Sequence, residues 1–370
     1  MTLALLTLLV ACAEKDAAYD PLSPDTAGYV EPLAWDLAVE GPYRTGYREL
    51  GTTYTPAPGM AERTIPVGVW YPTNDTEGTL AVYTSGFPDT GGTSAASIAD
   101  ASLATSPWGV QHPVMVYSHG FQGYGGSSSF LMRHFASHGW IVVAPDHVGN
   151  TLMDHQDPLP TAIYVARPRD VSAALDLLAD LPAEDPLAGK ADTTRVVLSG
   201  HSFGVFTTWS AGGARFENAA ARCDEGDVPE GRCTEAERDA LVGGLGDPRV
   251  VATIPLAGTI DRNWFGDAGP ADIAGPVLSM TGSNDDRGQA DQFATMRGVD
   301  FTWAELEGGC HQTFGIGTCG SLAMDEGFGL VDTLAMAFAR VHLLGDASAA
   351  GYLDGTVDLG PKVAIQHKNE

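Results

Sequence analysis

The feature that most restricts the fold of this 370-residue chain is a regular alternation of short apolar runs with helix-period stretches. Continuous apolar strands separated by helices indicate a parallel sheet that is covered by helices on both faces. An alternating run at 64–71 predicts an antiparallel strand ahead of that sheet. In such a sheet, functional residues gather at the carboxyl ends of the strands. The predicted strands are 113–118, 140–144, 195–199, 250–256, 276–280 and 301–306, and the predicted helices are 129–137, 170–181, 204–213, 291–297 and 329–344.

The motif with the clearest chemistry follows the third of these strands. Residues 195–199 lead into Gly200-His201-Ser202-Phe203-Gly204, and a helix is predicted next. G-x-S-x-G between a strand and a helix places the serine on a turn too tight for side chains at the two glycines. The turn lifts the hydroxyl clear of the sheet and puts the next N–H at a helix start, where the dipole favours an anion. A bare five-residue match is weak evidence, but this context predicts Ser202 as a nucleophile.

A nucleophilic serine needs a base and an acid that orients it, and two later strands end in candidates. The strand at 276–280 leads into an acidic turn that contains Asp285, and the strand at 301–306 leads into Glu307-Gly308-Gly309-Cys310-His311. Of the ten histidines, His311 alone combines a place after the last of these strands with a Gly-rich loop. We therefore predict His311 as the base and Asp285 as its acid. Asp286 and Asp261 remain alternatives for the acid.

Two backbone N–H groups are expected to hold the oxyanion of an acyl-transfer reaction. One is the N–H of Phe203, directly after the nucleophile. The other is expected in the loop Ser118-His119-Gly120-Phe121-Gln122-Gly123, where the N–H of Phe121 is the predicted donor. We interpret His119 and His201 as structural residues. Four aromatic residues near these motifs either line an apolar pocket or pack in the core: Phe121, Tyr124, Phe203 and Trp264.

The loop after the strand at 140–144 is rich in side chains that bind metals. It contains Asp146, His147, Asp154 and His155, but no spacing matches a zinc or EF-hand pattern. We therefore interpret it as the rim of a substrate cleft, and we expect neither a metal nor another cofactor.

Four ordered motifs resemble the bacterial predicted dienelactone-hydrolase group, which is similar to the platelet-activating-factor acetylhydrolases. The likeness runs from about Thr64 to His342 and implies the α/β-hydrolase fold, a mostly parallel sheet with helices on both faces, and a Ser-Asp-His esterase. True dienelactone hydrolases use a cysteine nucleophile, so their substrate is not implied. A cysteine-containing insert at about 215–247 also resembles that group and is expected to act as a partial lid. The motifs are Ser118-His119-Gly120-Phe121, Val143-Ala144-Pro145-Asp146-His147-Val148-Gly149-Asn150-Thr151, Arg167-Pro168-Arg169-Asp170 and Gly200-His201-Ser202-Phe203-Gly204.

The chain begins with an apolar block at 3–10 that is too short to span a bilayer as a helix. The block ends in Leu9-Val10-Ala11-Cys12, which resembles a bacterial lipobox whose cysteine becomes the lipidated first residue. A basic segment ahead of the block is missing, and an ordinary cleaved signal or a buried strand is the alternative. We expect a signal at 1–12, a flexible tether at 13–42 and an α/β-hydrolase domain at 43–370, exported to the cell envelope.

Export makes the other four of the five cysteines candidates for disulfides. Four cysteines allow three connectivities, and we expect the two local pairs Cys223–Cys233 and Cys310–Cys319. Free thiols are the alternative. The second pair would brace the loop that carries His311.

The net charge of −27 excludes nucleic acid as a partner, because such a surface repels phosphates. Membrane contact is expected only through lipid at Cys12. The predicted reaction is hydrolysis of a small-molecule or lipid carboxylic ester through an acyl-enzyme. A polyester depolymerase, a peptidase and a non-catalytic surface-binding lipoprotein are the alternatives. The last has no reason to retain Ser202, Asp285 and His311 together.

Overall fold

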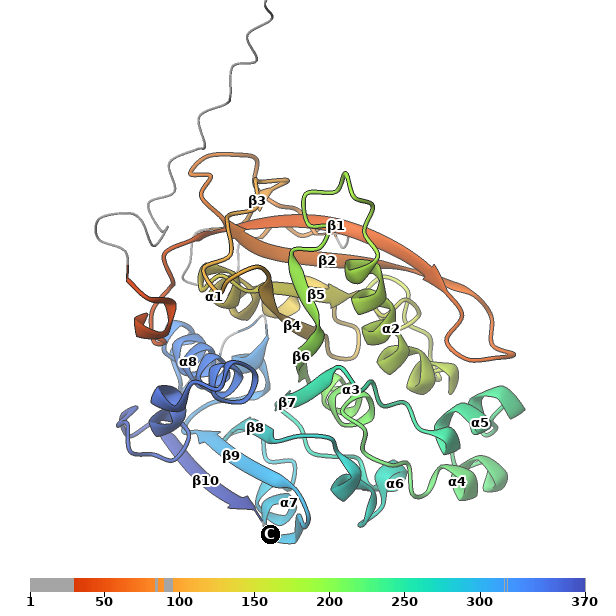
Figure 1. Cartoon of the computed structure of the whole chain (residues 1–370). Coiled ribbons are helices and arrows are strands. Elements are labelled where there is room, and N and C mark those ends of the chain that lie inside the picture. Colours follow the sequence, from red (N-terminus) through yellow and green to blue (C-terminus); the bar gives the residue numbers. More distant parts are fainter. Residues whose placement is uncertain (1–29, 84–85, 90–95, 316, 318, 370) are drawn as a thin grey trace, which may run out of the picture.

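The computed structural model of the chain describes residues 30–83, 86–89, 96–315, 317 and 319–369. These residues form a ten-stranded sheet in the order β10-β9-β8-β7-β6-β4-β5-β2-β1-β3 (Figure 1). The strands are β1 Arg44–Tyr54, β2 Arg63–Thr73, β3 Ile98–Ala99, β4 His112–Ser118, β5 Ile141–Pro145, β6 Ala191–His201, β7 Val250–Leu256, β8 Val277–Gly282, β9 Asp300–Leu306 and β10 Val363–Asn369. The α-helices are α1 Ser129–Ser137, α2 Ala162–Ala179, α3 Gly204–Ala211, α4 Ala219–Glu225, α5 Glu235–Gly243, α6 Arg262–Phe265, α7 Gln289–Thr295 and α8 Met324–Leu344. Short 3₁₀ helices are η1 Pro32–Ala34, η2 Gly125–Ser128, η3 Gly269–Asp272, η4 His311–Phe314 and η5 Ala347–Tyr352.

The six strands from β4 to β9 run parallel, as the apolar runs predict. The alternating run at 64–71 lies in β2, which pairs antiparallel with β5. Two further antiparallel strands, β1 and β10, pair with β2 and β9 and were not predicted. All six parallel strands therefore end at one edge of the sheet, where the predicted site residues lie.

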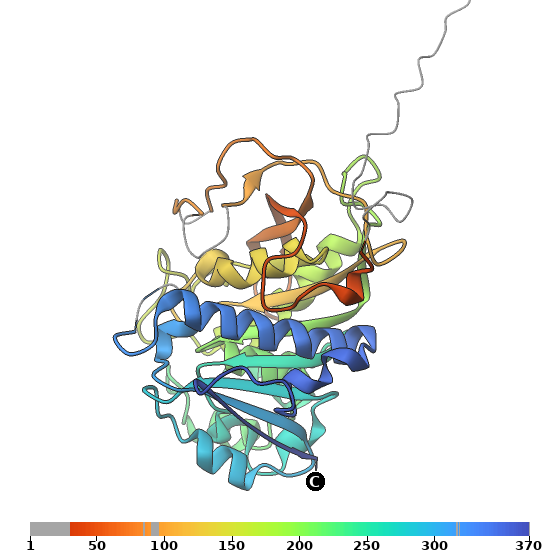
Figure 2. The ribbon, with the colours of Figure 1, turned by 90° about the vertical axis from the view of Figure 1, so that its left-hand side faces the viewer.

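Alternate side chains of the central strands face two different helical layers, as a strand period of two requires. Met115 and Tyr117 of β4 share a core with α1 and α8, whereas Val114 and Val116 share one with α2. Figure 2 shows α8 crossing one face of the sheet. The predicted fold class, a mostly parallel sheet with helices on both faces, is confirmed.

Within the described residues, α8 is the one helix long and apolar enough to cross a membrane by length and composition. Of the most apolar 18-residue stretch of this helix, 72% is buried inside the protein. Leu334 and Phe338 of this helix belong to the core that packs on the sheet. We therefore assign α8 to the hydrophobic core.

The segment before β1 differs from the predicted tether. Residues 30–42 pack against the domain: Leu37 is 3% exposed, and the Arg340 side chain of α8 donates hydrogen bonds to the carbonyls of Leu33 and Trp35. The prediction that a flexible tether reaches residue 42 is therefore wrong for these residues. The segment was missed because it is short and has no periodic pattern. The predicted signal segment and Cys12 lie outside the described residues.

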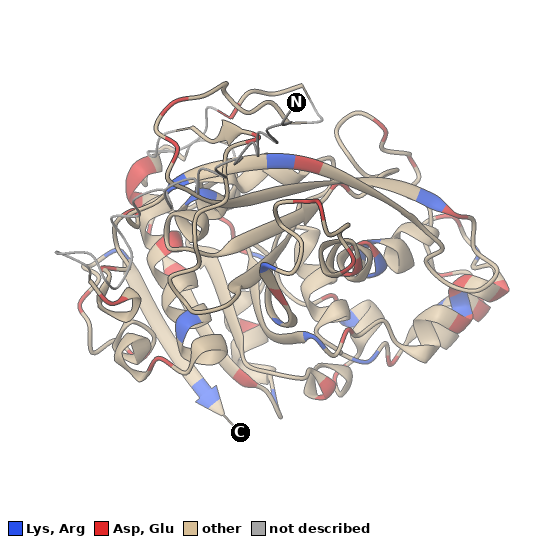
Figure 3. Ribbon diagram, turned by 45° about the horizontal axis from the view of Figure 1, so that its top comes forward, with Lys and Arg blue, Asp and Glu red and all other residues tan. Residues whose placement is uncertain are grey.

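Acidic residues outnumber basic residues in the chain. Lys and Arg are scattered in the view of Figure 3, while Asp and Glu occur along the loops and on the helices of the insert. This distribution is what an excess of 47 acidic over 20 basic side chains produces.

Candidate active site

Ser202 stands on the sharp turn between β6 and α3. Its φ is +56°, a left-handed conformation that side chains other than glycine rarely adopt. A Cβ at Gly200 would lie 2.5 Å from the carbonyl oxygen of Gly204, and a Cβ at Gly204 would lie 2.1 Å from the carbonyl oxygen of Ser118. Both glycines of the motif are therefore required by close packing, and the strained turn presents the Ser202 hydroxyl at the sheet edge.

His311 and Asp285 meet Ser202 at this edge. The Nε2 atom of His311 lies 2.9 Å from Ser202 Oγ, and Nδ1 lies 2.7 Å from Asp285 Oδ2. Because a carboxylate only accepts hydrogen bonds, we assign the proton to Nδ1, which leaves Nε2 free to accept from the serine. The structure thus brings the three predicted residues together in the order that acyl transfer needs.

The loops that carry the acid and the base are joined by their backbones. The N–H of Asn284 donates to the carbonyl of Gly309 at 2.8 Å, and the N–H of Ser283 donates to Leu306. The side chains are partly covered, with 13% of Asp285 and 25% of His311 exposed. The two loops therefore form one unit that fixes the distance from Asp285 to His311.

The two alternative acids have other roles. Asp261 caps α6 by accepting from the N–H of Asn263 at 3.0 Å. Asp286 Oδ1 accepts from the N–H of Gly288 at 3.0 Å. Of the three candidate acids, Asp285 is the one whose carboxylate meets His311.

Arg287 belongs to the site and was missed in the sequence. Its Nε donates to Asp285 Oδ1 at 2.9 Å, and its NH2 group lies 3.2 Å from His311 Nδ1. Asp285 thus bonds to His311 through one oxygen and to Arg287 through the other. No motif marks Arg287, because its contact depends on the fold of the loop after β8.

His201 has a more specific role than the structural packing that we predicted. Its Nε2 lies 3.0 Å from the carbonyl oxygen of His311, and the two rings lie 4.7 Å apart. Burial lowers the pKa of His201 to about 3, and the neighbouring His311 adds to the effect. The neutral ring therefore donates from Nε2 and holds the backbone at His311.

The two predicted oxyanion donors belong to segments that lie next to the serine. Gly120 is so close that a Cβ there would lie 3.1 Å from Ser202 Cβ. In the same loop, Gln122 N–H donates to Asn150 and Gly123 N–H donates to Gly120. Within the described part of the chain, the N–H groups of Phe121 and Phe203 have no intramolecular acceptor. Both N–H groups are therefore available to a ligand oxygen.

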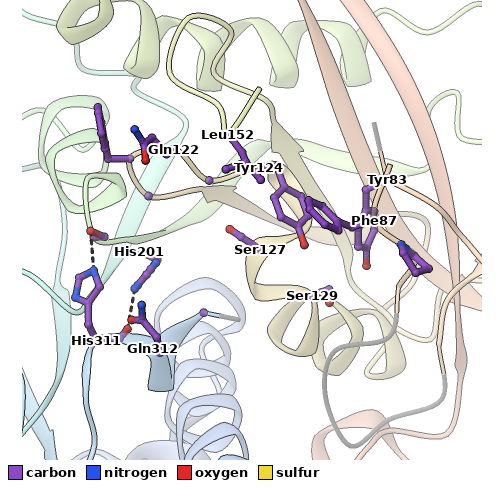
Figure 4. Close-up of a pocket in the computed structure, with 16 residues that line it drawn as sticks. Tyr83, Phe87, Gln122, Tyr124, Ser127, Ser129, Leu152, His201, His311 and Gln312 are labelled. Atoms are coloured by element: carbon purple, nitrogen blue, oxygen red, sulfur yellow. Dashed lines mark hydrogen bonds between the residues drawn. The ribbon is translucent and has the colours of Figure 1, made fainter. Parts of the chain in front are cut away.

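A pocket of about 450 Å³ opens from the serine. His311, the hydrogen-bond partner of Ser202, lies at one end, and an aromatic wall of Tyr83, Phe87 and Tyr124 forms the other (Figure 4). The rings of Phe87 and Tyr124 stack at 5.4 Å between centroids. The full lining is Tyr83, Phe87, Pro88, Gly120, Phe121, Gln122, Gly123, Tyr124, Ser127, Ser129, Leu152, His201, Ser202, His311, Gln312 and Gly315.

Of the four aromatic residues noted in the sequence, Phe121 and Tyr124 line this pocket. Phe203 and Trp264 instead pack around Tyr164 beside α3. Tyr83 and Phe87 were missed, because they lie between β2 and β3, far along the chain from every motif.

The insert at 215–247 does not form part of this pocket. Its helices α4 and α5 pack on each other, α5 also packs on α2 and α4 on α6, and no insert residue is in the pocket lining. The expectation of a partial lid is therefore wrong for the described residues. The disulfide Cys223–Cys233 joins the insert's two helical segments, and Cys310–Cys319 closes the loop at His311, so both predicted pairs are present.

The ligand-rich loop after β5 is held by protein contacts. His147 is buried and bonds to Asp170 and Ser118, and Asp154 accepts from the N–H groups of Gly149 and Thr151. No group of three or more metal-binding side chains occurs among the residues that the structure describes.

Comparisons with known proteins bear on the fold of the chain. A protein-family model described as chlorophyllase matches residues 93–215, a span that includes the loop at 118–123 and Ser202. No curated protein matches the chain. Among solved structures, the chain is similar to the ferulic acid esterase from Streptomyces cinnamoneus, with a TM-score of 0.60 and 21% identity over 88% of this chain and 96% of that one. The chain therefore has the α/β-hydrolase fold.

Proposed function

We propose that the protein hydrolyses carboxylic esters through an acyl-enzyme on Ser202. The observation that carries the proposal is the series of hydrogen bonds from Ser202 Oγ through the His311 ring to Asp285. The chlorophyllase family model and the ferulic acid esterase neighbour both support ester hydrolysis. A serine, a histidine and an acid in this order serve acyl transfer on many folds.

The proposed reaction needs only this chain's own groups and water. Ser202 Oγ attacks the ester carbonyl while His311 Nε2 takes its proton, and Asp285 stabilises the imidazolium that results. The N–H groups of Phe121 and Phe203 hold the oxyanion. The tetrahedral intermediate then releases the alcohol, which takes the proton from His311. Water repeats the sequence, releases the acid and restores Ser202.

We further propose that the substrate carries an aromatic group. The wall formed by Tyr83, Phe87 and Tyr124 offers stacked and edge contacts to a flat ring, and these arrangements are favourable for aromatic pairs. The ferulic acid esterase neighbour is named for an acid of this type. Peptide and polyester hydrolysis remain the alternative activities of the same site.

We propose that the enzyme works outside the cytoplasm, tethered by lipid at Cys12. The two disulfides are compatible with an exported protein. Labelling with a radioactive fatty acid in the producing cell, compared with Cys12→Ser, tests the tether: label in wild type alone supports it, and no label in either contradicts it.

The catalytic proposal is tested first at the nucleophile. A fluorophosphonate probe should label the wild type, and Ser202→Ala should be neither labelled nor active on p-nitrophenyl acetate. Ser127→Ala is the matched control, because Ser127 lines the same pocket but has no contact with His311. Full activity in Ser202→Ala, or loss of labelling in Ser127→Ala alone, would overturn the assignment.

The acid is tested by three amide substitutions. Asp285→Asn should lower kcat by about 10²–10⁴-fold, because the imidazole loses the partner that fixes its tautomer. Asp261→Asn and Asp286→Asn should stay near wild type, since both carboxylates bond to backbone N–H groups elsewhere. A large loss confined to Asp261→Asn would replace Asp285 as the acid.

A further inference from the structure

A cluster of buried polar side chains lies behind the oxyanion site, and none of them takes part directly in the proposed reaction. Its centre is Arg167 on α2, which is fully buried. The guanidinium donates to Ser118 Oγ at 3.1 Å, to Asn150 Oδ1 at 2.7 Å, to Thr207 Oγ1 at 3.1 Å and to the carbonyl of His119. One side chain thus joins the end of β4, the loop after β5 and α3.

Arg167 contacts both segments that carry the oxyanion donors. His119, whose carbonyl it binds, precedes Phe121 by two residues. On the other side, Arg167 Cζ lies 4.7 Å from the centroid of the Phe203 ring, a cation–π distance. Thr207 lies one turn into the helix that begins after Phe203. The planar fork of the guanidinium therefore spans the gap between the two donors.

A second Ser-His-Asp series reinforces the same strand end. Ser118 Oγ lies 2.9 Å from His147 Nε2, and His147 Nδ1 lies 2.8 Å from Asp170 Oδ2. All three side chains are completely buried, so no substrate reaches Ser118. The backbone N–H of His147 also donates to His119 Nε2 at 2.9 Å. This series is a scaffold that holds residues 118–119 where Arg167 binds them.

Burial of the Arg167 charge is energetically costly, so packing alone does not explain why an arginine lies here. All four of its hydrogen-bond acceptors are uncharged, and the nearby Asp170 carboxylate favours the charge without bonding to it. A buried charge held this way costs more than an apolar side chain of similar volume. Burial lowers the pKa of Arg167 to about 9, which still leaves the guanidinium charged at neutral pH. The cost of burying the charge is explained if the guanidinium sets the distance between the loop of Phe121 and the turn of Phe203.

We propose that Arg167 is a positioning residue of the oxyanion site, which ties the loop of Phe121 to the turn of Phe203 and so fixes the distance between their N–H groups. This inference rests on the proposed function. Loss of the guanidinium fork should therefore reduce the stabilisation of the transition state and leave the binding of substrate in the ground state unchanged.

Arg167→Lys tests the role, because lysine keeps the charge and loses the bridging fork. We expect kcat for p-nitrophenyl acetate to fall by about 10–100-fold, because removal of an oxyanion donor costs about 10²–10³-fold and a displaced donor costs less. KM should change by less than about threefold. Arg340→Lys is the matched control: Arg340 is equally buried but bonds to Leu33, Trp35 and Asp346, away from the site. It should lower the melting temperature and leave kcat within about twofold.

The decisive readout is inhibition by a trifluoromethyl ketone. Ser202 Oγ adds to its carbonyl carbon, the serine proton passes to His311, and the carbonyl oxygen becomes an anion in the oxyanion site. In Arg167→Lys the Ki should rise by the same factor by which kcat/KM falls. A merely structural loss, seen as a smaller active fraction by fluorophosphonate titration, would lower the apparent kcat and leave the Ki unchanged.

A folded Arg167→Lys variant with wild-type kcat and Ki would overturn the positioning role while the proposed function stands. If that variant does not fold, Thr207→Val removes only the acceptor on α3, and kcat/KM and 1/Ki should then fall together by a few fold. No change in either would also overturn the role. If the wild type is neither labelled by fluorophosphonate nor active on esters, the proposed function fails and the positioning role fails with it.

Discussion

The ring of Phe87 is the most exposed part of the aromatic wall, with 43% of its surface accessible beside the pocket. Phe87→Ala should lower kcat/KM for methyl cinnamate or benzyl acetate by about tenfold, because one aromatic pair and its buried area are lost. Methyl butyrate, which has no ring, should be hydrolysed at nearly the wild-type rate. Initial rates by pH-stat titration measure all three esters.

Met153→Ala is the control for this change, since Met153 is 74% exposed and lies outside the pocket lining. It should leave the three rates unchanged. An equal loss on all esters in Phe87→Ala would contradict an aromatic subsite, and so would a wild type that prefers methyl butyrate to both aromatic esters.

At the scale of single residues, sequence identified the groups that a motif and chain order mark. Ser202 lies in a motif, and His311 and Asp285 follow successive strands, so the fold places them at one edge. Arg287 and Phe87 could not be found in this way. Their contacts depend on how a loop folds back, and no periodic or spacing rule encodes that.

At the scale of structural elements, the disulfide Cys310–Cys319 closes the loop that carries the catalytic histidine candidate. Cys310 lies immediately before His311. Replacing both cysteines with serine should lower the free energy of unfolding by about 2–3 kcal/mol, the loop-entropy value for a ring of this size. It should also lower kcat, because η4 and the His311 ring lose a covalent brace. Urea unfolding and kcat on p-nitrophenyl acetate measure the two effects.

The second disulfide supplies the control. Cys223–Cys233 closes a loop of 10 residues in sequence separation, against 9 for Cys310–Cys319, so the expected loss of stability is similar. The Cys223→Ser/Cys233→Ser variant should nevertheless keep its kcat, because the insert does not line the pocket. Equal effects of the two variants on kcat would contradict a local role for Cys310–Cys319.

Elements were predicted well where they are buried and less well at the margins. The parallel strands are continuous apolar runs because both of their faces are covered. The strand β10, Val363–Asn369, has no fully buried residue. Residues 48–54 of β1 likewise have none. Such strands are defined by their pairing with a neighbour, which sequence does not show. The partial lid was wrong for a related reason: an insert's place in the chain does not tell which way it packs.

Over the whole molecule, acid stability depends on opposing buried groups. Burial raises the pKa of Asp146 to about 6, so protonation of this carboxyl favours the folded state as pH falls. Burial lowers the pKa of His138 to about 4 from its ordinary 6.5, with Arg340 adding to the effect, so protonation of this ring opposes folding. The pH dependence of the free energy of unfolding therefore contains contributions of both signs. The difference in this free energy between wild type and a variant that lacks one titrating group isolates the contribution of that group.

His138 is the group to isolate, because it joins the N-terminal segment to the domain. Its Nε2 donates to the carbonyl of Val39 at 3.0 Å, and its ring lies 6.0 Å from that of Trp35. Between pH 6.5 and 4, His138 is protonated in the unfolded chain and neutral in the folded chain. Stability is therefore present in full above pH 6.5 and is lost as pH falls, by at most about 1.4 kcal/mol per pH unit.

His138→Gln keeps an N–H donor toward Val39 and removes the titration. At pH 7.5 it should be less stable than wild type by about 1 kcal/mol, the value of an imperfectly replaced buried contact. At pH 5 the difference should vanish or reverse, because only the wild type loses stability to protonation of His138. Urea unfolding at pH 7.5, 6 and 5 measures the difference. Parallel stability curves for wild type and His138→Gln would show that folding does not lower the pKa of this ring, and would contradict its burial beneath residues 30–42.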